Sequence, residues 1–410
     1  METPFEIFTH SSGIRIVHRQ VNSPVAHCAL VIDAGSRDEN DNEQGMAHFM
    51  EHVLFKGTKK RKAYHVLSRL EDIGGELNAY TSKEETVLYA SVLERHLPRA
   101  IELIFEIAFQ STLPEKEVNK ERDVINDEIS SYLDSPSELI FDDFEELIYA
   151  GHPIGRNILG TPESLEAINR ERLLDWINKH YSPERMVFST VGNFSLKDIR
   201  KWIDKYALEV RTGDARYHRR PINEYTPKYQ SEAKETYQTH AIIGNRAYGM
   251  HHPDLSALIL LNNLLGGPGM NSRLNLNIRE KYGFAYNIES FFTPYTDTGV
   301  IGVYVGTDKG TIDRTLRLVQ RELKLLREKK LGVVQLKKAK QQILGQIALG
   351  QENNSSASIG QGRTLLHYNR IETFEDIAKR IESISSDALL RVANEVFDPN
   401  QLSTLIYKAR

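Results

Sequence analysis

Two histidines and a glutamate stand close together near the start of the chain, in the order H-x-x-E-H: His48, Glu51 and His52. Apolar residues recur around them at three- and four-residue intervals, which predicts a helix with one face in a core and Gly57 as its stop. On such a helix, histidines four residues apart project from one face. Two imidazoles at that spacing can hold one zinc ion, and the glutamate beside them can take a proton from a metal-activated water.

The motif alone has an ordinary alternative, because histidines beside an apolar stripe can simply be boundary residues of a core. A two-histidine zinc site also needs a further protein ligand. A second helix is predicted just after Pro114, in the segment EKEVNKERDVINDEISSYLD. Its Glu121 and Glu128 are seven residues apart and point the same way, although a charged helix face is usually just solvated.

The composition is that of a globular protein of two or three domains. The chain has 410 residues, of which 40% are hydrophobic and 26% are charged. The net charge of −4 argues against an obligate nucleic-acid partner. Cys28 is the one cysteine, so no disulfide can form within the chain, and a reducing compartment is the natural inference.

Residues 1–20 contain Glu2 and Glu6 and lack the apolar run of a signal peptide. No stretch approaches 18 consecutive apolar residues, so we expect no membrane span. Together with the cysteine count, this predicts a cytoplasmic location.

Alternating and helical patterns predict the elements around the motif. Residues 14–35 are expected to form two strands separated by Asn22-Ser23-Pro24. Residues 63–73 are expected to form a helix that ends at Gly74-Gly75, followed by strands in ELNAYTSKE and TVLYASVL. A further helix is expected over residues 97–112.

On these motifs the chain resembles the pitrilysin-type zinc peptidases, the inverzincins, which include insulin-degrading enzyme, the mitochondrial processing peptidase beta subunit and small bacterial zinc peptidases. The likeness rests on H-x-x-E-H and on ERDVINDEI, whose last glutamate lies 76 residues after the second histidine. Further matches are GGELNAYTSKEETVLY, GHPIGRNILGT and YSPERMVFSTVGN, so the resemblance covers most of the chain.

The resemblance implies roles for five residues around one Zn²⁺ per chain. His48, His52 and Glu128 would be the zinc ligands, and Glu51 would be the general base. Glu121 would be a carboxylate behind the ligands that orients one of them.

In the second half of the chain, the run from Ser272 to Tyr286 matches the family's C-terminal pattern. The resemblance implies that Arg279 and Tyr286 reach the substrate backbone, where such donors can stabilise a developing oxyanion. Without the resemblance, Arg279 would be called a surface helix residue and Tyr286 a strand residue.

The resemblance also implies how a peptide would be bound. The segment LNAYT, with Asn78 and Ala79, resembles the family's edge strand, which pairs with substrate by β-augmentation. Glu138 and Asp142 share a helix face after Pro136, and acidic residues at matching positions of the mitochondrial processing peptidase recognise a substrate arginine. We therefore expect a mild preference for basic residues near the cut, unless FDDFEE is only an acidic surface.

The two halves of the chain resemble each other. HAIIGN matches HCALVID, and ALILLNNLLGG matches AHFMEHVLFKG. When the two halves are aligned with an offset of about 212 residues, Leu260 and Leu264 align with His48 and His52. A similar offset aligns Gln346 with Glu128, so the second copy has lost its metal site.

We therefore predict an α+β fold of two homologous domains from an internal duplication, each an antiparallel sheet with packed helices. The zinc-bearing domain is expected over residues 1–210, a linker over 211–230 and the degenerate domain over 231–410. Longer family members close a chamber with four such domains in one chain. Two domains per chain therefore imply a dimer, expected to be a homodimer, with a heterodimer with a related chain also possible.

The function predicted for the chain is that of a zinc metalloendopeptidase acting on unfolded or extended peptides. The alternative is a non-catalytic core-type subunit, or a partner-dependent subunit of a heterodimeric processing peptidase. A structural zinc site is a third hypothesis, but it needs four protein ligands, and Cys28 lies 20 residues away on a predicted strand.

Overall fold

The computed structural model describes residues 5–207, 219–222 and 224–410 of the chain. These residues form two compact units, each with its own sheet and core. Unit 1 takes its described residues from Met1–Ile129, Arg156–Arg220 and Leu349–Ile371. Unit 2 takes its described residues from Ser130–Gly155, Pro221–Ala348 and Glu372–Arg410.

The strands form one sheet in each unit. Unit 1 holds β1 (Phe5–Thr9), β2 (Arg15–Gln20), β3 (Val25–Ile32), β4 (Glu76–Thr81), β5 (Thr86–Leu93) and β6 (Met186–Gly192). Unit 2 holds β7 (Tyr229–Lys234), β8 (Thr239–Ala247), β9 (Ala285–Pro294), β10 (Gly299–Thr307) and β11 (Ser403–Ala409). The strand orders are β1-β2-β6-β3-β5-β4 and β7-β11-β8-β10-β9.

The helices of the first half are α1 (Met46–Leu54), α2 (Ala63–Glu71), α3 (Leu97–Gln110), α4 (Glu115–Leu133), α5 (Pro136–Ile148), α6 (Pro162–Glu166), α7 (Arg170–His180) and α8 (Leu196–Tyr206). Those of the second half are α9 (Leu255–Gly266), α10 (Ile312–Glu328), α11 (Val333–Gln351), α12 (Asn354–Tyr368), α13 (Phe374–Ser383) and α14 (Ser386–Val396). Residues Asn275–Glu280 form a π-helical turn before β9.

The two sheets share one topology, which confirms the predicted duplication. Without β1, the order β2-β6-β3-β5-β4 matches β7-β11-β8-β10-β9 strand for strand. In each sheet the first pair of this series is parallel and the other pairs are antiparallel. The predicted α+β class is therefore confirmed, with one parallel pair in each sheet as the departure from a purely antiparallel arrangement.

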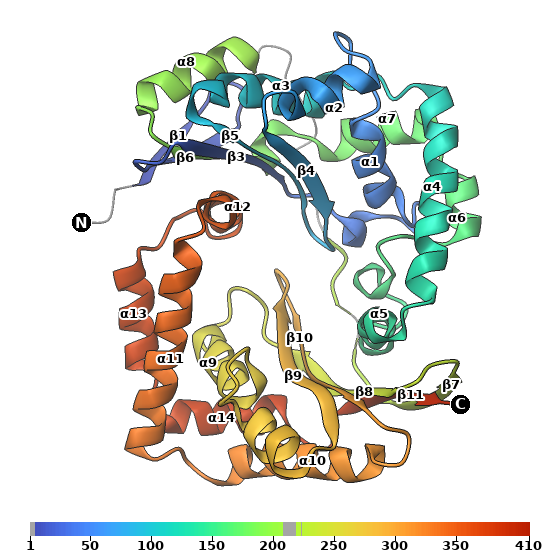
Figure 1. Cartoon of the computed structure of the whole chain (residues 1–410), viewed down its shortest axis with the longest axis vertical. Coiled ribbons are helices and arrows are strands. Elements are labelled where there is room, and N and C mark those ends of the chain that lie inside the picture. The colour runs from blue at the N-terminus through green and yellow to red at the C-terminus, as the bar shows by residue number, and fades with distance from the viewer. Residues whose placement is uncertain (1–4, 208–218, 223) are drawn as a thin grey trace. The chain divides into compact units, whose positions relative to one another are not determined.

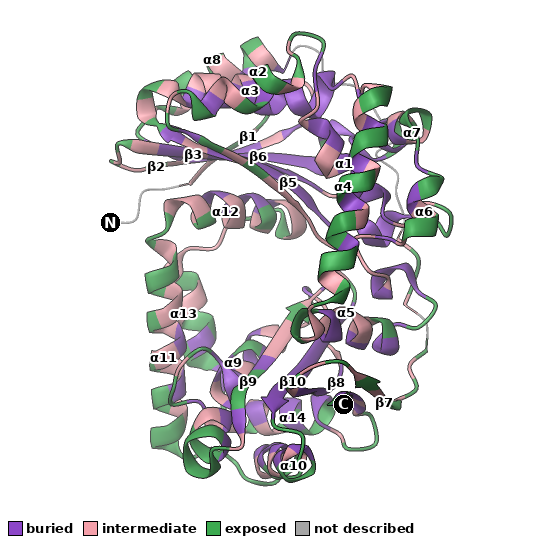
Figure 2. Ribbon diagram, turned by 45° about the vertical axis from the view of Figure 1, so that its right-hand side comes forward, coloured by how far each residue is buried: buried purple, intermediate pink, exposed green. Residues whose placement is uncertain are grey.

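One face of the unit 1 sheet carries a large core under several helices. Alternating strand residues such as Cys28, Leu30 and Ile32 pack with the apolar faces of α1, α3, α4, α7 and α8. The helix α12 covers the opposite face of the same sheet (Figure 1). Figure 2 shows the strands largely buried between these layers, whereas α4 exposes much of its length.

The helix α12 is a segment from the second half of the chain that belongs to unit 1. Its Gly362 approaches the sheet closely, because a Cβ there would lie 2.8 Å from Cγ2 of Val31. Gln361 donates hydrogen bonds to Oγ of Ser189 at 2.8 Å and to the backbone carbonyl of Thr190 at 3.0 Å. A small residue and a buried amide therefore fix this helix on the strands.

Unit 2 receives a helix from the first half of the chain in return. The helix α5 packs Leu139, Ile140 and Phe144 against Ile242 and Tyr407 of the second sheet. The other face of that sheet carries the core formed with α9, α10, α11, α13 and α14. In both copies, the exchanged helix is the one that follows the long helix α4 or α11.

The elements predicted around the motif are confirmed to within a few residues, as β2, β3, α1, α2, β4, β5, α3 and α4. The expected domain ranges treat each copy as one continuous stretch, whereas the compact units exchange segments 130–155 and 349–371. Of the expected linker, residues 211–218 and 223 lie outside the described residues. Arg219 belongs to unit 1, where it pairs with Asp33 at 2.6 Å and Asp38 at 2.9 Å.

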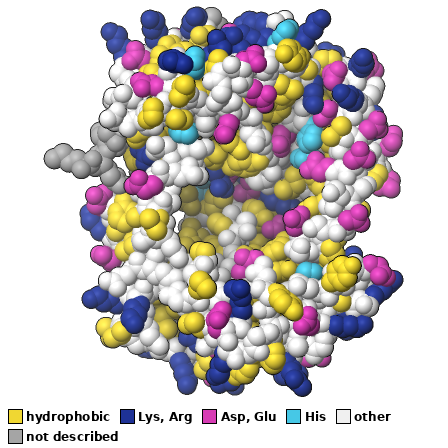
Figure 3. All heavy atoms as spheres, in the orientation of Figure 1, with side chains coloured by type: hydrophobic (Ala, Val, Ile, Leu, Met, Phe, Trp, Pro, Cys, Tyr) yellow, Lys and Arg dark blue, Asp and Glu magenta, His cyan; other side chains and the backbone are white. Residues whose placement is uncertain are grey.

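The surface of unit 1 carries many cationic side chains over its helical layer, as the upper part of Figure 3 shows. The helix α8 alone contributes Lys197, Arg200, Lys201 and Lys205. Within the described ranges, no helix is long and apolar enough to span a membrane.

Candidate metal centre

The helix α1 carries three of the predicted site residues, and a buried carboxylate fixes its N-terminus. Gly45 precedes the helix with φ of 85°, a left-handed conformation that favours glycine. The Glu39 carboxylate accepts hydrogen bonds from the backbone N–H groups of Gly45 at 3.0 Å and Ala47 at 2.9 Å. Because Glu39 is buried, these bonds hold the first turn of the helix in place.

The side chains of His48, His52 and Glu128 come together, on α1 and α4 of unit 1. Nε2 of His48 lies 3.8 Å from Oε1 of Glu128, and Nε2 of His52 lies 3.5 Å from Oε2. One ligand atom from each residue lies within 4.8 Å of the other two. Ligands of a tetrahedral zinc ion are about 3.4 Å apart, so this donor set fits one zinc ion after small movements.

His48 has the chemical state that a metal ligand needs. Burial, followed by the nearby charge of His52, lowers the pKa of His48 to about 3. The imidazole is therefore neutral at pH 7 and keeps a lone pair. Its Nδ1 is buried and has no hydrogen-bond partner among the residues described.

The two glutamates of α4 face opposite nitrogens of His52. Nδ1 of His52 donates to Oε2 of Glu121 at 3.2 Å, which leaves the Nε2 lone pair directed to the Glu128 side. The other oxygen of Glu121 lies 2.8 Å from Nζ of Lys56. The Glu121 side chain is 4% exposed and that of Glu128 is 45% exposed, so only Glu128 opens to solvent.

Glu51 is held by a residue at the end of the edge strand. Oγ1 of Thr81 donates to Oε2 of Glu51 at 2.6 Å. Burial raises the pKa of the Glu51 carboxyl above its usual range, although the Thr81 bond and the charge of His52 act in the opposite direction. A half-buried carboxyl group beside the histidines, with a raised pKa, is suited to proton transfer.

Asn78 and Ala79 lie in β4, which is the edge of the unit 1 sheet. Asn78 is exposed, and its Oδ1 accepts a hydrogen bond from the backbone N–H of Ala79 at 2.8 Å. Thr81 at the end of this strand contacts Glu51 of α1. The edge that could pair with an extended peptide is thus connected to the predicted base.

Glu138 and Asp142 lie one turn apart on α5, in unit 2. Glu138 is exposed, whereas Asp142 is half-buried and accepts a hydrogen bond from the hydroxyl of Tyr132. The structure therefore does not join them to the metal-ligand group within one unit.

Arg279 and Tyr286 also belong to unit 2. Arg279 is exposed in the π-helical turn, and it has no carboxylate within ion-pair distance in the described ranges. Tyr286 is 61% exposed on β9, and its hydroxyl lies 3.5 Å from Oδ2 of Asp308. Both side chains are accessible, and their role at the metal centre stays a prediction.

Unit 2 has a cavity of about 410 Å³ where α9, β9 and α11 meet. The face of α9 that lines it carries Ile259, Asn262 and Asn263, which have the spacing of His48, Glu51 and His52. Gln346 lines it from α11. An alignment of Ile259 with His48 differs by one residue from the alignment expected from the sequence, which paired His48 with Leu260. Leu260 is fully buried in the core and does not line the cavity.

Three residues of the site were missed by sequence reasoning: Glu39, Lys56 and Thr81. Lys56 had a detectable signal, because it follows His52 by four residues and so shares its helix face. Glu39 lies in a polar loop and Thr81 in a strand, and no local pattern connects either of them to α1.

Comparison with known protein families gives two matches. The pattern of the insulinase family (peptidase family M16) matches residues 15–162, and the pattern of the peptidase M16 inactive domain matches residues 167–343. A solved peptidase M16 inactive domain from Pseudomonas fluorescens superposes with a TM-score of 0.92 at 19% identity, covering 99% of this chain and 98% of that one. A protease from Helicobacter pylori superposes with a TM-score of 0.89 at 23% identity, covering 99% and 100%.

Similar sequences cover nearly the whole chain. An uncharacterized zinc protease of Bacillus subtilis is 32% identical over 97% of both chains. The mitochondrial-processing peptidase beta subunit of mouse is 32% identical over 94% of this chain and 80% of its own length. These matches confirm the predicted resemblance, and the chain belongs to peptidase family M16, the insulinase or pitrilysin-type family of zinc proteases.

Proposed function

We propose that this protein is a zinc metalloendopeptidase of the H-x-x-E-H type that hydrolyses peptide bonds in unfolded or extended peptides. The observation that carries the proposal is the grouping of His48, His52 and Glu128, with Glu51 on the same helix. Family membership and relatives named zinc proteases support it.

One zinc ion on His48, His52 and Glu128 would supply a Lewis acid that polarises the scissile carbonyl and acidifies a water molecule. Glu51 would accept a proton from a water molecule as its oxygen attacks the carbonyl carbon, and would give that proton to the amine nitrogen as the C–N bond breaks. The hydrogen bond from Thr81 keeps the Glu51 carboxylate in one orientation for both transfers.

The chain's other predicted residues bind and orient the peptide. The free edge of β4, with Asn78 and Ala79, accepts an extended peptide as an additional strand, which reads backbone and tolerates many sequences. Arg279 and Tyr286 donate hydrogen bonds to the substrate backbone near the carbonyl that reacts. This assignment to Arg279 and Tyr286 rests on the resemblance of their sequence pattern.

Specificity follows from the acidic face of α5. Glu138 is exposed and can pair with a basic side chain, whereas Asp142 accepts a hydrogen bond from the Tyr132 hydroxyl. Charge complementarity of this kind gives a mild preference, because exposed pairs contribute about 1 kcal/mol or less.

The proposed assembly is a homodimer, because one chain carries both the metal residues and the Arg279/Tyr286 pair. A second candidate is a partner-dependent subunit. It is favoured by the similarity to a protein named as the beta subunit of the mitochondrial-processing peptidase. In that case the purified chain needs a related chain for activity.

The proposal is tested by mass spectrometry of a long, unstructured, basic peptide incubated with the zinc-loaded wild type and with Glu51→Gln. We expect cleavage by the wild type and a loss of about 100-fold or more in the variant, with fragments that end near basic residues. Equal cleavage by both proteins would contradict the role of Glu51. Cleavage by neither would favour the partner-dependent subunit.

A further inference from the structure

A lysine shares the buried carboxylate that holds His52. Lys56 lies just beyond α1, and its Nζ is 2.8 Å from Oε1 of Glu121. The second oxygen of the same carboxylate accepts the hydrogen bond from Nδ1 of His52 at 3.2 Å. The three side chains therefore form a chain of contacts from an ammonium group, through a carboxylate, to an imidazole.

We propose that Lys56 is a positioning residue of the metal centre. It contacts one oxygen of the Glu121 carboxylate and so fixes the position of the other oxygen. That second oxygen holds the ring of His52 in its metal-binding orientation. The inference rests on the proposed zinc function, and it adds a residue that acts through two others rather than on substrate.

Burial makes the contact between Lys56 and Glu121 important. The Glu121 side chain is 4% exposed, and its polar contacts in the described ranges are Lys56 and His52. A buried carboxylate needs a charged partner and satisfied oxygens, and a neutral imidazole offers only one N–H. Without Lys56, one oxygen of Glu121 loses its partner, and the carboxylate is free to rotate away from His52.

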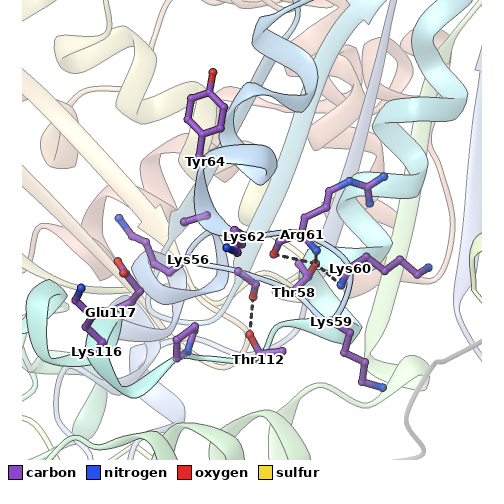
Figure 4. A pocket seen from close by; sticks show the side chains of 13 residues that line it. Lys56, Thr58, Lys59, Lys60, Arg61, Lys62, Tyr64, Thr112, Lys116 and Glu117 are labelled. Atoms are coloured by element: carbon purple, nitrogen blue, oxygen red, sulfur yellow. Dashed lines mark hydrogen bonds between the residues drawn. The ribbon is translucent and has the colours of Figure 1, made fainter.

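The surroundings of Lys56 direct its ammonium group to Glu121. Lys56 is one of the residues around a cavity of about 590 Å³ in unit 1, whose lining has six cationic side chains and the single carboxylate of Glu117. Figure 4 shows Lys116 on the same side of this pocket as Lys56, with Glu117 between them, and Lys62 nearer the middle. The excess of cationic over anionic side chains in this lining disfavours an ammonium group turned into the pocket and favours the contact with Glu121.

The pocket also supplies a matched control. Lys62 is exposed, lines the same cavity and has no carboxylate within ion-pair distance among the residues described. Replacing it removes the same charge from the same pocket and leaves the Lys56–Glu121 contact in place. A difference in zinc affinity between the Lys56 and Lys62 variants therefore reports the loss of the Lys56–Glu121 contact and not the loss of net charge.

The experiment measures the zinc dissociation constant of wild type, Lys56→Met, Lys56→Arg and Lys62→Met by competition with a chelating dye. For Lys56→Met we expect about a tenfold weaker affinity, since partners behind metal ligands typically change it 10–100-fold. Lys56→Arg keeps a cation opposite Glu121 and is expected to restore most of the affinity, and Lys62→Met is expected to equal wild type.

The absorption spectrum of the cobalt-substituted protein is the second readout, because it reports ligand geometry independently of turnover. We expect the visible bands to change in Lys56→Met and to remain in Lys62→Met. The melting temperature of each metal-free protein identifies a variant that has lost its fold. If Lys56→Met unfolds, Lys56→Gln takes its place with the same expectation.

Wild-type zinc affinity and an unchanged spectrum in Lys56→Met would overturn the inference, as would an equal loss of affinity in Lys62→Met. Both results leave the proposed peptidase function standing, because the wild type still binds zinc and cleaves peptide. A wild type that binds no zinc would instead overturn the proposed function itself.

Discussion

Glu121 and Glu128 occupy the same face of α4, yet their surroundings differ. The seven-residue spacing predicts that both point toward α1, and both do. The spacing does not tell which one meets the Nε2 atoms of the histidines and which one meets Nδ1 of His52. The structure separates them by burial, since Glu128 is half-exposed and Glu121 is enclosed.

Glu128→Gln tests the third ligand at this position. An amide oxygen is a much poorer zinc ligand than a carboxylate, so we expect zinc affinity to fall by at least about tenfold. Asp127→Asn is the matched control. Asp127 is an exposed neighbour on the same helix, and its substitution removes the same charge. Equilibrium dialysis with metal analysis measures both, and equal affinities of the two variants would contradict the assignment of Glu128.

Local patterns could predict which residues gather at the metal centre, but not how they are supported. His48, Glu51 and His52 follow from a helical repeat, and Glu128 follows from family resemblance. Thr81 bonds to Glu51 of α1, which is 30 residues away in the sequence. Glu39 bonds to backbone N–H groups 6 and 8 residues away. These hydrogen bonds leave no periodic signal in the sequence. Such contacts depend on tertiary packing, which a single sequence does not display.

The exchange of α5 and α12 between the units was not predictable for a similar reason. The contact face of α12 mixes the polar or small residues Ser358, Gln361 and Gly362 with the apolar residue Leu365, so its apolar stripe is narrow. Its docking also depends on hydrogen bonds and on a close approach of the backbone. The apolar periodicity that located α1 and α3 therefore carried no information about the partner of α12.

The docking of α12 predicts a pH-dependent stability. Glu85, buried just before β5, accepts hydrogen bonds from Nε of Arg363 at 2.6 Å and Nε2 of His367 at 2.7 Å. Burial raises the pKa of Glu85, but the bonds and charges of His367 and Arg363 outweigh it and lower the pKa below the usual value. This carboxylate therefore stabilises the fold above pH of about 4.5, and the contribution is lost as pH falls through the lowered pKa.

We expect Glu85→Gln to reduce the free energy of unfolding by about 1–3 kcal/mol at pH 7. The difference from wild type is expected to shrink as the pH falls below about 4.5, where the wild-type carboxyl also becomes neutral. Urea unfolding at several pH values measures this. A difference that stays constant or grows on acidification would contradict the ion-pair account of the docking.

Across the whole molecule, one duplicated architecture carries two different sites. The two units share one strand order, and the face of α9 that lines the unit 2 cavity has Ile259, Asn262 and Asn263 at the spacing of His48, Glu51 and His52. Amide and aliphatic side chains at these positions do not form a zinc site. The chain is therefore expected to hold one metal ion and to use its second copy for substrate.

The proposed homodimer is a prediction at this scale. Static light scattering of the purified protein is expected to give twice the mass of one chain at micromolar concentration. A monomer that becomes active only with a related chain would favour the partner-dependent subunit instead.

The central claim is that one zinc ion, held by His48, His52 and Glu128, makes this chain a peptidase. The most direct measurement is a zinc titration of the chelator-treated protein, with peptide cleavage and the far-ultraviolet circular dichroism spectrum recorded at each step. We expect cleavage to rise from near zero and reach its plateau at one zinc per chain, with the spectrum unchanged, because both cores are formed without metal ligands. Cleavage that persists without zinc, or a fold lost on chelation, would contradict this account.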